Sequence, residues 1–179
     1  MKTMIMLAAL FTLFGMRAEA APLEIGARIP DVTGIDQSGK AVSFKEVAST
    51  GYVLVYFYPK ADTPGCTAQA CSLRDAYVQL QEKGVRVFGV SADKPESQKK
   101  FQDKYHLPFE LIADSDGKVI EAFGVPRIPL VGFATRQAYL FKDGTLVWRD
   151  LKAATREQAA DVLKVLNSAK SVSAAVSLE

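Results

Sequence analysis

The sequence has little cysteine and histidine, the residues that usually hold structural zinc. Its 179 residues include two cysteines and one histidine, His106. A structural zinc site usually takes four cysteine or histidine ligands, and three are too few. There is also no glycine-rich phosphate loop and no dinucleotide fingerprint, so we expect no bound nucleotide. The sequence therefore predicts a protein that works without a metal or another cofactor.

An excess of charge of one sign is also lacking. The 22 lysines and arginines nearly balance the 20 aspartates and glutamates, which leaves a formal net charge of +2. So small a charge does not predict binding to nucleic acid or to an anionic membrane. With 49% hydrophobic and 23% charged residues, and with no internal repeat or linker, the chain suits one globular domain with a full core.

The apolar run at the N-terminus is too short to cross a membrane comfortably. It extends from Met4 to Phe14, follows Lys2 and precedes the small-residue pattern Ala18-Glu19-Ala20. This arrangement is typical of a secretory signal that is cleaved after Ala20. We expect a signal peptide at 1–20, a single domain at 21–170 and a flexible C-terminal tail at 171–179. The protein would then be exported, to the periplasm in a diderm cell, with no stable membrane association after cleavage.

Apolar and turn patterns predict an α/β domain. Near-continuous apolar strands at 52–58 and 85–90 flank a helix that begins at Pro64 and stops at Gly84, which is the pattern of a parallel βαβ unit. The Asp143-Gly144 pair predicts a hairpin between two later strands. The remaining expected elements are a hairpin around 34–40, short helices at 44–48 and 118–123, strands at 109–112, 138–141 and 145–148, and helices at 95–105 and 155–169, the last with Thr155 as its N-cap.

Both cysteines lie where a buried strand leads into a helix. Pro59 ends the strand because proline cannot donate to a sheet ladder. Thr63 suits the N-cap and Pro64 the first helical position. Cys66 therefore falls in the first turn, where free backbone N–H groups and the positive end of the helix dipole favour a thiolate. Because a thiolate is the nucleophile of redox chemistry, this placement predicts a reactive cysteine.

Cys71 follows Cys66 by five residues. On a regular helix this spacing separates the two residues by ~140° around the axis and ~7.5 Å along it, which puts their Cα atoms ~8.7 Å apart. A disulfide needs Cα atoms within about 7 Å of each other, so the helix must unwind locally before the two can join. We therefore predict a switch between a reduced helix and an oxidised, unwound segment.

The motif Pro59-x-x-x-Thr63-x-x-Cys66 resembles the active-site signature of the peroxiredoxins. The longer string from Phe57-Tyr58-Pro59-Lys60 through Thr63-Pro64-Gly65-Cys66-Thr67 to Ala70-Cys71 and Leu73-Arg74-Asp75 resembles their Q-type branch, the bacterioferritin comigratory proteins. The resemblance extends from about Ile25 to the helix near Ala169. It implies a thioredoxin-like α/β fold with a central mixed sheet flanked by helices and an N-terminal hairpin, which the expected order of elements also fits.

The resemblance further implies a thiol peroxidase that reduces hydrogen peroxide and organic hydroperoxides. Cys66 would be oxidised to a sulfenic acid, Cys71 would resolve it as an intramolecular disulfide, and a thioredoxin-like dithiol would reduce that bond. Thr63 would place a hydroxyl beside the sulfur, and Pro59 would cap the pocket and limit water. We expect the protein to be a monomer.

Two arginines are candidates for stabilising the thiolate and the leaving oxygen. Arg136 directly precedes an apolar strand and resembles the family's arginine that leads into a strand, whereas Arg127 lies earlier in the same proline-containing segment. We favour Arg136, because that end of the strand can lie beside the turn that holds Cys66, where a guanidinium would favour the thiolate.

Two other functions fit an exported protein with two cysteines. One is a binding module without chemistry that carries a structural disulfide, although so short a loop would stabilise the fold only weakly. The other is a thioredoxin-like dithiol-disulfide oxidoreductase that acts on proteins, which usually needs Cys-x-x-Cys, a motif that is absent here. An assay of peroxide consumption with a dithiol reductant distinguishes all three.

Overall fold

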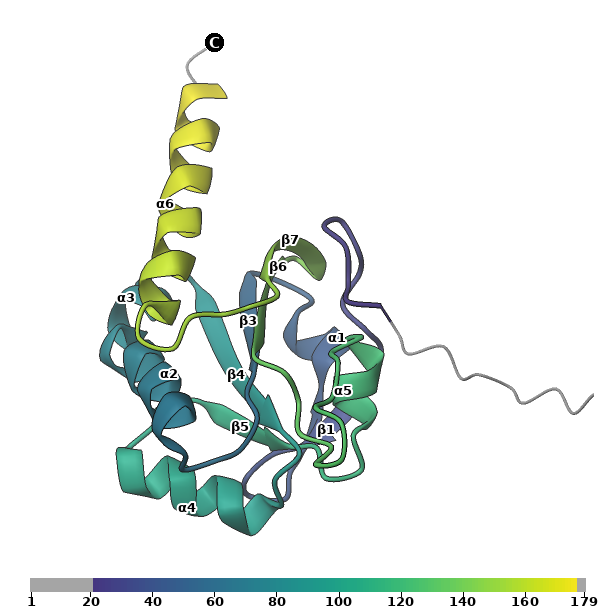
Figure 1. Ribbon diagram of the computed structural model, residues 1–179. Helices are drawn as coiled ribbons and strands as arrows, with labels where there is room; N and C mark the ends of the chain where they lie inside the picture. Colours follow the sequence, from purple (N-terminus) through teal and green to yellow (C-terminus); the bar gives the residue numbers. More distant parts are fainter. Residues whose placement is uncertain (1–20, 177–179) are drawn as a thin grey trace, which may run out of the picture.

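A computed structural model describes residues 21–176, with the backbone alone described beyond Ser168. The predicted signal peptide at 1–20 and residues 177–179 lie outside the described part. A mixed five-stranded sheet forms the centre, in the order β5-β4-β3-β6-β7 (Figure 1). Its strands are β3 (Tyr52–Phe57), β4 (Val85–Ser91), β5 (Glu110–Ala113), β6 (Gln137–Lys142) and β7 (Thr145–Asp150).

Helices cover both faces of this sheet (Figure 1). One face is covered by α2 (Pro64–Asp75), α3 (Tyr77–Glu82), α4 (Pro95–Tyr105) and the first turns of α6 (Gln158–Val176), which then projects beyond the sheet. The other face is covered by α1 (Phe44–Val47) and α5 (Lys118–Ala122). The strand β3 is therefore buried on both faces: Leu54, Tyr56 and the following Tyr58 pack towards α2, while Val53, Val55 and Phe57 pack towards α1 and α5. This two-sided burial explains its continuous apolar sequence.

The strand pairings confirm the predicted mixed sheet. β3 runs parallel to β4 and antiparallel to β6, and β6 forms the predicted antiparallel hairpin with β7. The predicted N-terminal hairpin is also present, as β1 (Thr33–Ile35) and β2 (Ala41–Ser43). A carboxylate oxygen of Asp36 accepts hydrogen bonds from the backbone N–H groups of Ser38 and Lys40, which fixes the turn between them.

The helix predicted from Pro64 to Gly84 is two helices, so this prediction was wrong in its length. α2 ends at Asp75 and α3 begins at Tyr77, while Gly84, at φ +73°, ends α3 as expected. No proline or glycine interrupts residues 66–83. The break instead coincides with a tertiary contact, since Arg74 donates to the carbonyl of Tyr105 at the end of α4.

The predicted start and end of the last helix were also wrong. α6 begins at Gln158, three residues after Thr155, and continues to Val176, so residues 171–176, predicted to lie in the tail, are helical. The late start coincides with a tertiary contact, because the N–H group of Ala159 donates to the hydroxyl of Ser72 on α2 and so needs no local cap. The late end follows from the lack of glycine and proline after Thr155.

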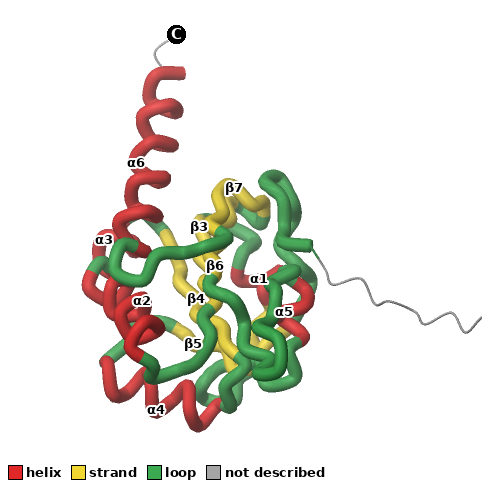
Figure 2. Tube along the Cα trace, in the orientation of Figure 1, coloured by secondary structure: helices red, strands yellow, loops and turns green. Residues whose placement is uncertain are grey.

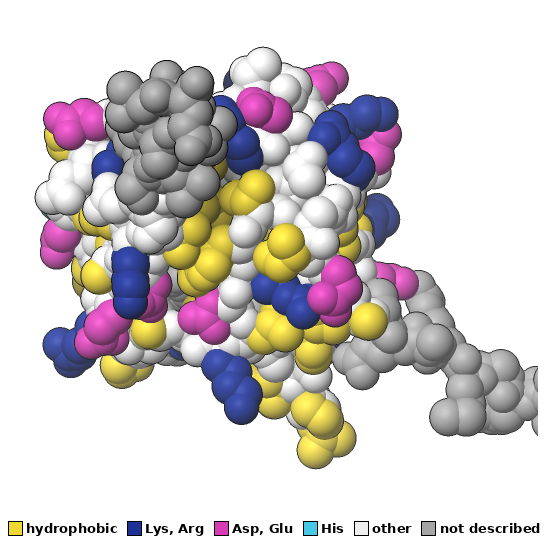
Figure 3. Space-filling view, turned by 90° about the horizontal axis from the view of Figure 1, so that it is seen from above, with side chains coloured by type: hydrophobic (Ala, Val, Ile, Leu, Met, Phe, Trp, Pro, Cys, Tyr) yellow, Lys and Arg dark blue, Asp and Glu magenta, His cyan; other side chains and the backbone are white. Residues whose placement is uncertain are grey.

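The long connection between α5 and β6 is a loop (Figure 2). It is closed on itself by a bridge between Arg127 and Ala134. No helix in the described part of the chain is long and apolar enough to cross a membrane. On the face seen from above, basic and acidic side chains are interspersed rather than gathered by sign (Figure 3).

Candidate active site

Cys66 lies in the first turn of α2, where the sequence predicts it. Pro64 and Gly65 precede it in the helix, and Thr63 occupies the N-cap position. The residue is buried, at 1% exposure, and both cysteines are free thiols in this structure. The unpaired N–H groups of a helix start favour negative charge, so this position suits a thiolate.

Arg136, the residue directly before β6, reaches Cys66. Its Nη2 donates to Sγ of Cys66 at 3.4 Å. The register of the sheet explains this contact: Phe57, the last residue of β3, pairs with Gln137, the first residue of β6. The residue before β6 therefore lies beside the chain that leaves β3 for α2, and the guanidinium is directed at the start of that helix.

Arg127, the competing arginine, lies elsewhere. Its guanidinium rests against Gly117, so closely that an added methyl group at this glycine would lie 1.2 Å from Nη2. Its charge lowers the pKa of Asp114, although burial, the larger effect, leaves that pKa raised overall. Of the two candidate arginines, Arg136 is therefore the one that contacts the cysteine.

Gly65 provides the space that Arg136 needs. A Cβ atom at this position would lie 3.3 Å from Nη2 of Arg136 and 3.7 Å from a methyl carbon of Thr155. The first of these distances is shorter than ordinary van der Waals contact, so any side chain here would push against the guanidinium. The glycine thus allows the guanidinium of Arg136 to approach the first turn of α2 closely.

Thr63 and Pro59 lie in the loop between β3 and α2. The hydroxyl of Thr63 donates to the carbonyl oxygen of Lys60 at 3.0 Å, and the side chain makes no capping bond to α2. The prediction of an N-cap is thus correct for the position and wrong for the side-chain bond. Pro59 is half-buried at the beginning of this loop. The catalytic role of Thr63 and the pocket-capping role of Pro59 stay predictions.

Cys71 lies on the same helix as Cys66. It is half-buried, and α2 is a single helix from Pro64 to Asp75, so the helical estimate of ~8.7 Å between the two Cα atoms applies. The two thiols therefore cannot form a disulfide without a change in the backbone of α2.

Two buried glutamines that the sequence analysis missed complete the site. Gln69, one turn after Cys66, accepts a hydrogen bond from Nη1 of Arg136, and its own amide donates to Oε1 of Gln158 at 2.7 Å. A polar residue three positions after Cys66, on the same helix face, was a usable signal for Gln69. No local signal identifies Gln158, because it comes from α6, 89 residues later in the chain.

Tyr56 lies beneath α2 on β3 and is fully buried. Burial raises the pKa of its phenol well above the usual value, the nearby Tyr58, Cys66 and Cys71 add to this, and Arg136 opposes it. The hydroxyl is therefore neutral at physiological pH. Among the residues that the structure describes, it has no hydrogen-bond partner.

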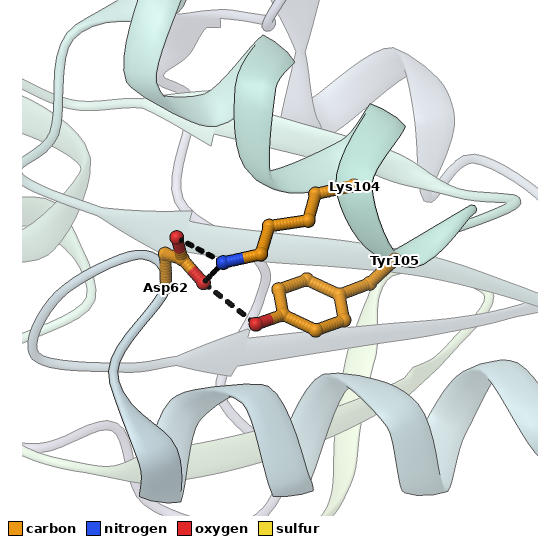
Figure 4. Close-up of polar contacts among 3 residues, drawn as sticks. All are labelled: Asp62, Lys104 and Tyr105. Atoms are coloured by element: carbon orange, nitrogen blue, oxygen red, sulfur yellow. Dashed lines mark hydrogen bonds and ion pairs between the residues drawn. The ribbon is translucent and has the colours of Figure 1, made fainter.

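Polar contacts to the end of α4 fix both ends of α2. Before the helix, Asp62 accepts hydrogen bonds from Lys104 at 2.8 and 2.9 Å and from the hydroxyl of Tyr105 at 2.7 Å (Figure 4). The bonds from Lys104, followed by that from Tyr105, lower the pKa of Asp62. Near the other end, Arg74 donates to the backbone carbonyl of Tyr105 at 2.9 Å. The segment that carries both cysteines is thus held at its two ends by the last two residues of α4, Lys104 and Tyr105.

Comparison with known proteins places this site in a family. The AhpC/TSA family model matches residues 25–149, and the chain belongs to this family.

No group of three or more histidine, cysteine, aspartate or glutamate side chains that could hold a metal occurs in the described part of the chain.

The curated relatives support the predicted Q-type resemblance. Chloroplastic peroxiredoxin Q of Gentiana triflora is 42% identical over 127 residues, which are 70% of this chain and 58% of that protein. Peroxiredoxin Bcp of Escherichia coli strain K12 is 48% identical over 104 residues, which are 58% of this chain and 66% of that protein. The chain thus matches somewhat less than two thirds of the length of these relatives.

Solved structures confirm the thioredoxin-like fold of the peroxiredoxin type. Peroxidoxin BcpB of Mycobacterium tuberculosis superposes with a TM-score of 0.76 at 28% identity, covering 82% of this chain and 97% of that one. The bacterioferritin comigratory protein of Xanthomonas campestris, described for its alkyl peroxide reduction activity, superposes with a TM-score of 0.73 at 25% identity, covering 83% and 98%.

Proposed function

We propose that this protein is a thiol-dependent peroxidase that reduces hydrogen peroxide and organic hydroperoxides. The observation that carries the proposal is the contact of Arg136 with the sulfur of Cys66 at the start of α2. A cation and a helix N-terminus that converge on one sulfur are placed to stabilise negative charge on it. The peroxiredoxin Q and Bcp relatives, and the alkyl peroxide reduction ascribed to the Xanthomonas protein, support the same reaction.

In the first step, the thiolate of Cys66 attacks one oxygen of the peroxide. The S–O bond forms as the O–O bond breaks, and the leaving oxygen takes a proton to become water or an alcohol. Arg136 is close enough to the sulfur to stabilise the negative charge that develops on that oxygen. Cys66 is left as a sulfenic acid.

In the second step, the thiolate of Cys71 attacks the sulfenic sulfur. A disulfide forms, and the hydroxyl group of the sulfenic acid leaves as water once it is protonated. Because both cysteines lie on α2, this step requires the helix to unwind between its anchored ends. A thioredoxin-like dithiol would then reduce the disulfide and restore both thiols.

Export and oligomeric state belong to the same proposal. The apolar run followed by Ala18-Glu19-Ala20 supports a cleaved signal and a periplasmic location. A monomer is sufficient for the proposed chemistry, because both cysteines and the arginine come from one chain. Gel filtration of the mature protein and fractionation of expressing cells measure these two properties.

The test is peroxide consumption with a thioredoxin-like dithiol as reductant. Cys66→Ser should abolish consumption, because it removes the nucleophile, while Glu82→Gln, an exposed change on α3, should leave it intact. Cys71→Ser should allow one turnover, with a sulfenic acid trapped on Cys66, and block recycling. Peroxide consumption that is unaffected by Cys66→Ser would refute the proposal. Reduction of protein disulfides without peroxide consumption would favour the oxidoreductase, and neither activity would favour the binding module.

A further inference from the structure

A chain of buried amides connects the start of α6 to the sulfur of Cys66. Arg136 donates through Nη2 to the sulfur and through Nη1 to Oε1 of Gln69. Gln69 in turn donates through Nε2 to Oε1 of Gln158, at 2.7 Å. Both glutamines are fully buried, at 0% exposure, so water does not compete for these bonds.

The arginine sets the direction of every bond in this chain. A guanidinium can only donate, so the amide of Gln69 must present its oxygen to Arg136. Its NH₂ group must then face Gln158, and Gln158 must present its oxygen in return. The orientation of all three side chains is therefore fixed by chemistry rather than by a choice between equivalent amide rotamers.

The far end of the chain is unsatisfied. Nε2 of Gln158 is buried without a hydrogen-bond partner among the described residues. A buried donor without a partner destabilises the folded state, because it has lost its hydrogen bonds to water. Methionine or leucine at this position would avoid that cost at a similar size, so glutamine is not the residue that folding stability alone favours here. The side-chain oxygen of Gln158, in contrast, accepts the hydrogen bond from Gln69.

We propose that Gln158 is a positioning residue for the peroxide reaction. It holds the amide of Gln69, which holds Arg136 in the orientation that directs Nη2 at the sulfur of Cys66. The inference rests on the proposed function of Cys66 as the peroxidatic thiol. Gln158, the first residue of the C-terminal helix, is thereby a component of the active site, although it is linked to Cys66 only through Gln69 and Arg136.

The structure provides a matched control for a purely structural role. Ser72, also on α2, accepts a hydrogen bond from the N–H group of Ala159 at 3.2 Å, which ties together the same two helices. This bond has no connection to Arg136. If Gln158 merely helps α6 to dock on α2, then Ser72→Ala and a change at Gln158 should act alike on the reaction with peroxide.

The experiment isolates the first chemical step. In a Cys71→Ser background, the sulfenic acid on Cys66 is trapped at millisecond intervals after hydrogen peroxide is added and is quantified by mass spectrometry. Gln158→Met should lower the second-order rate constant about tenfold, because a buried bond in a chain that ends on a charged group is lost. Ser72→Ala should stay within about twofold of its parent. Thermal unfolding of each variant shows that it is folded, and Gln158→Ala provides a second variant should the first fail to fold.

A double substitution tests the route through Gln69. If Gln158 acts only through Gln69, Gln69→Met together with Gln158→Met should react no more slowly than Gln69→Met alone. Losses that multiply, or a Gln158→Met protein as fast as its parent, would overturn the inference and leave the proposed function standing. A parent protein whose Cys66 does not react with peroxide would overturn the proposed function, and the inference with it.

Discussion

Replacing Arg136 by alanine should slow the oxidation of Cys66 far more than it destabilises the fold. A unit charge 3.4 Å from a thiolate interacts with it by about 5 kcal/mol at an effective dielectric constant of about 20. This value is an upper bound, because water partly replaces a half-buried side chain. A hydrogen bond to a charged group contributes a net stabilisation of about 1.5–3 kcal/mol, and this range applies to the contact of Arg136 with the thiolate. It corresponds to a rate loss of roughly 10- to 150-fold.

The assay is stopped-flow oxidation by hydrogen peroxide in the Cys71→Ser background, and Arg127→Ala is its control. Arg127 is also an arginine of the connection between α5 and β6, but it lies against Gly117 instead of the cysteine. Its removal should change the rate constant by less than about twofold. A slow Arg127→Ala protein beside a fast Arg136→Ala protein would show that the contact seen in the structure does not determine the chemistry.

Three further outcomes are expected. Gly65→Ala should raise the thermal stability slightly, because alanine favours a helix by up to about 1 kcal/mol over glycine. The same change should slow the peroxide reaction, because the added Cβ atom pushes against Arg136. A faster reaction would contradict this expectation. The lowered pKa of Asp62 implies a stabilisation that is present above the ordinary value of 3.8 and lost as the pH falls through the lowered value. Asp62→Asn should therefore reduce the free energy of unfolding at pH 7 and make no difference at strongly acid pH. Amides in the middle of α2 should exchange slowly in the reduced protein and much faster once mass spectrometry confirms the Cys66–Cys71 disulfide, whereas equal protection in both states would refute the unwinding.

The sequence predicts best what is decided locally. The strand that ends at Pro59 and the helix that starts after Thr63 follow from proline chemistry and apolar runs, and they put Cys66 in the first turn of α2. The position of Arg136 was predictable too, since it depends only on which strands pair. The proline and capping signals lie within a few residues of the strand and helix that they predict, whereas the position of Arg136 follows from the pairing of β3 with β6.

The features that were missed depend on contacts between distant segments. No pattern near Thr155 indicates that α6 begins three residues later, because the hydroxyl that meets its first turn belongs to Ser72 on another helix. The break after Asp75 likewise coincides with a bond from Arg74 to α4 rather than with a helix-breaking residue. Gln158 joins the site for the same reason, through a contact that only the folded chain provides.

The double attachment of α2 to Tyr105 has a kinetic consequence. Asp62 and Arg74 bind the same residue of α4, so an unwound segment between them remains a short tethered loop rather than a free chain. Within such a loop, Cys71 meets Cys66 at an effective concentration that is set by the tether, on the order of millimolar or higher, and not by how much protein is present. Disulfide closure should therefore be a first-order process whose rate is the same in a dilute solution as in a crowded compartment.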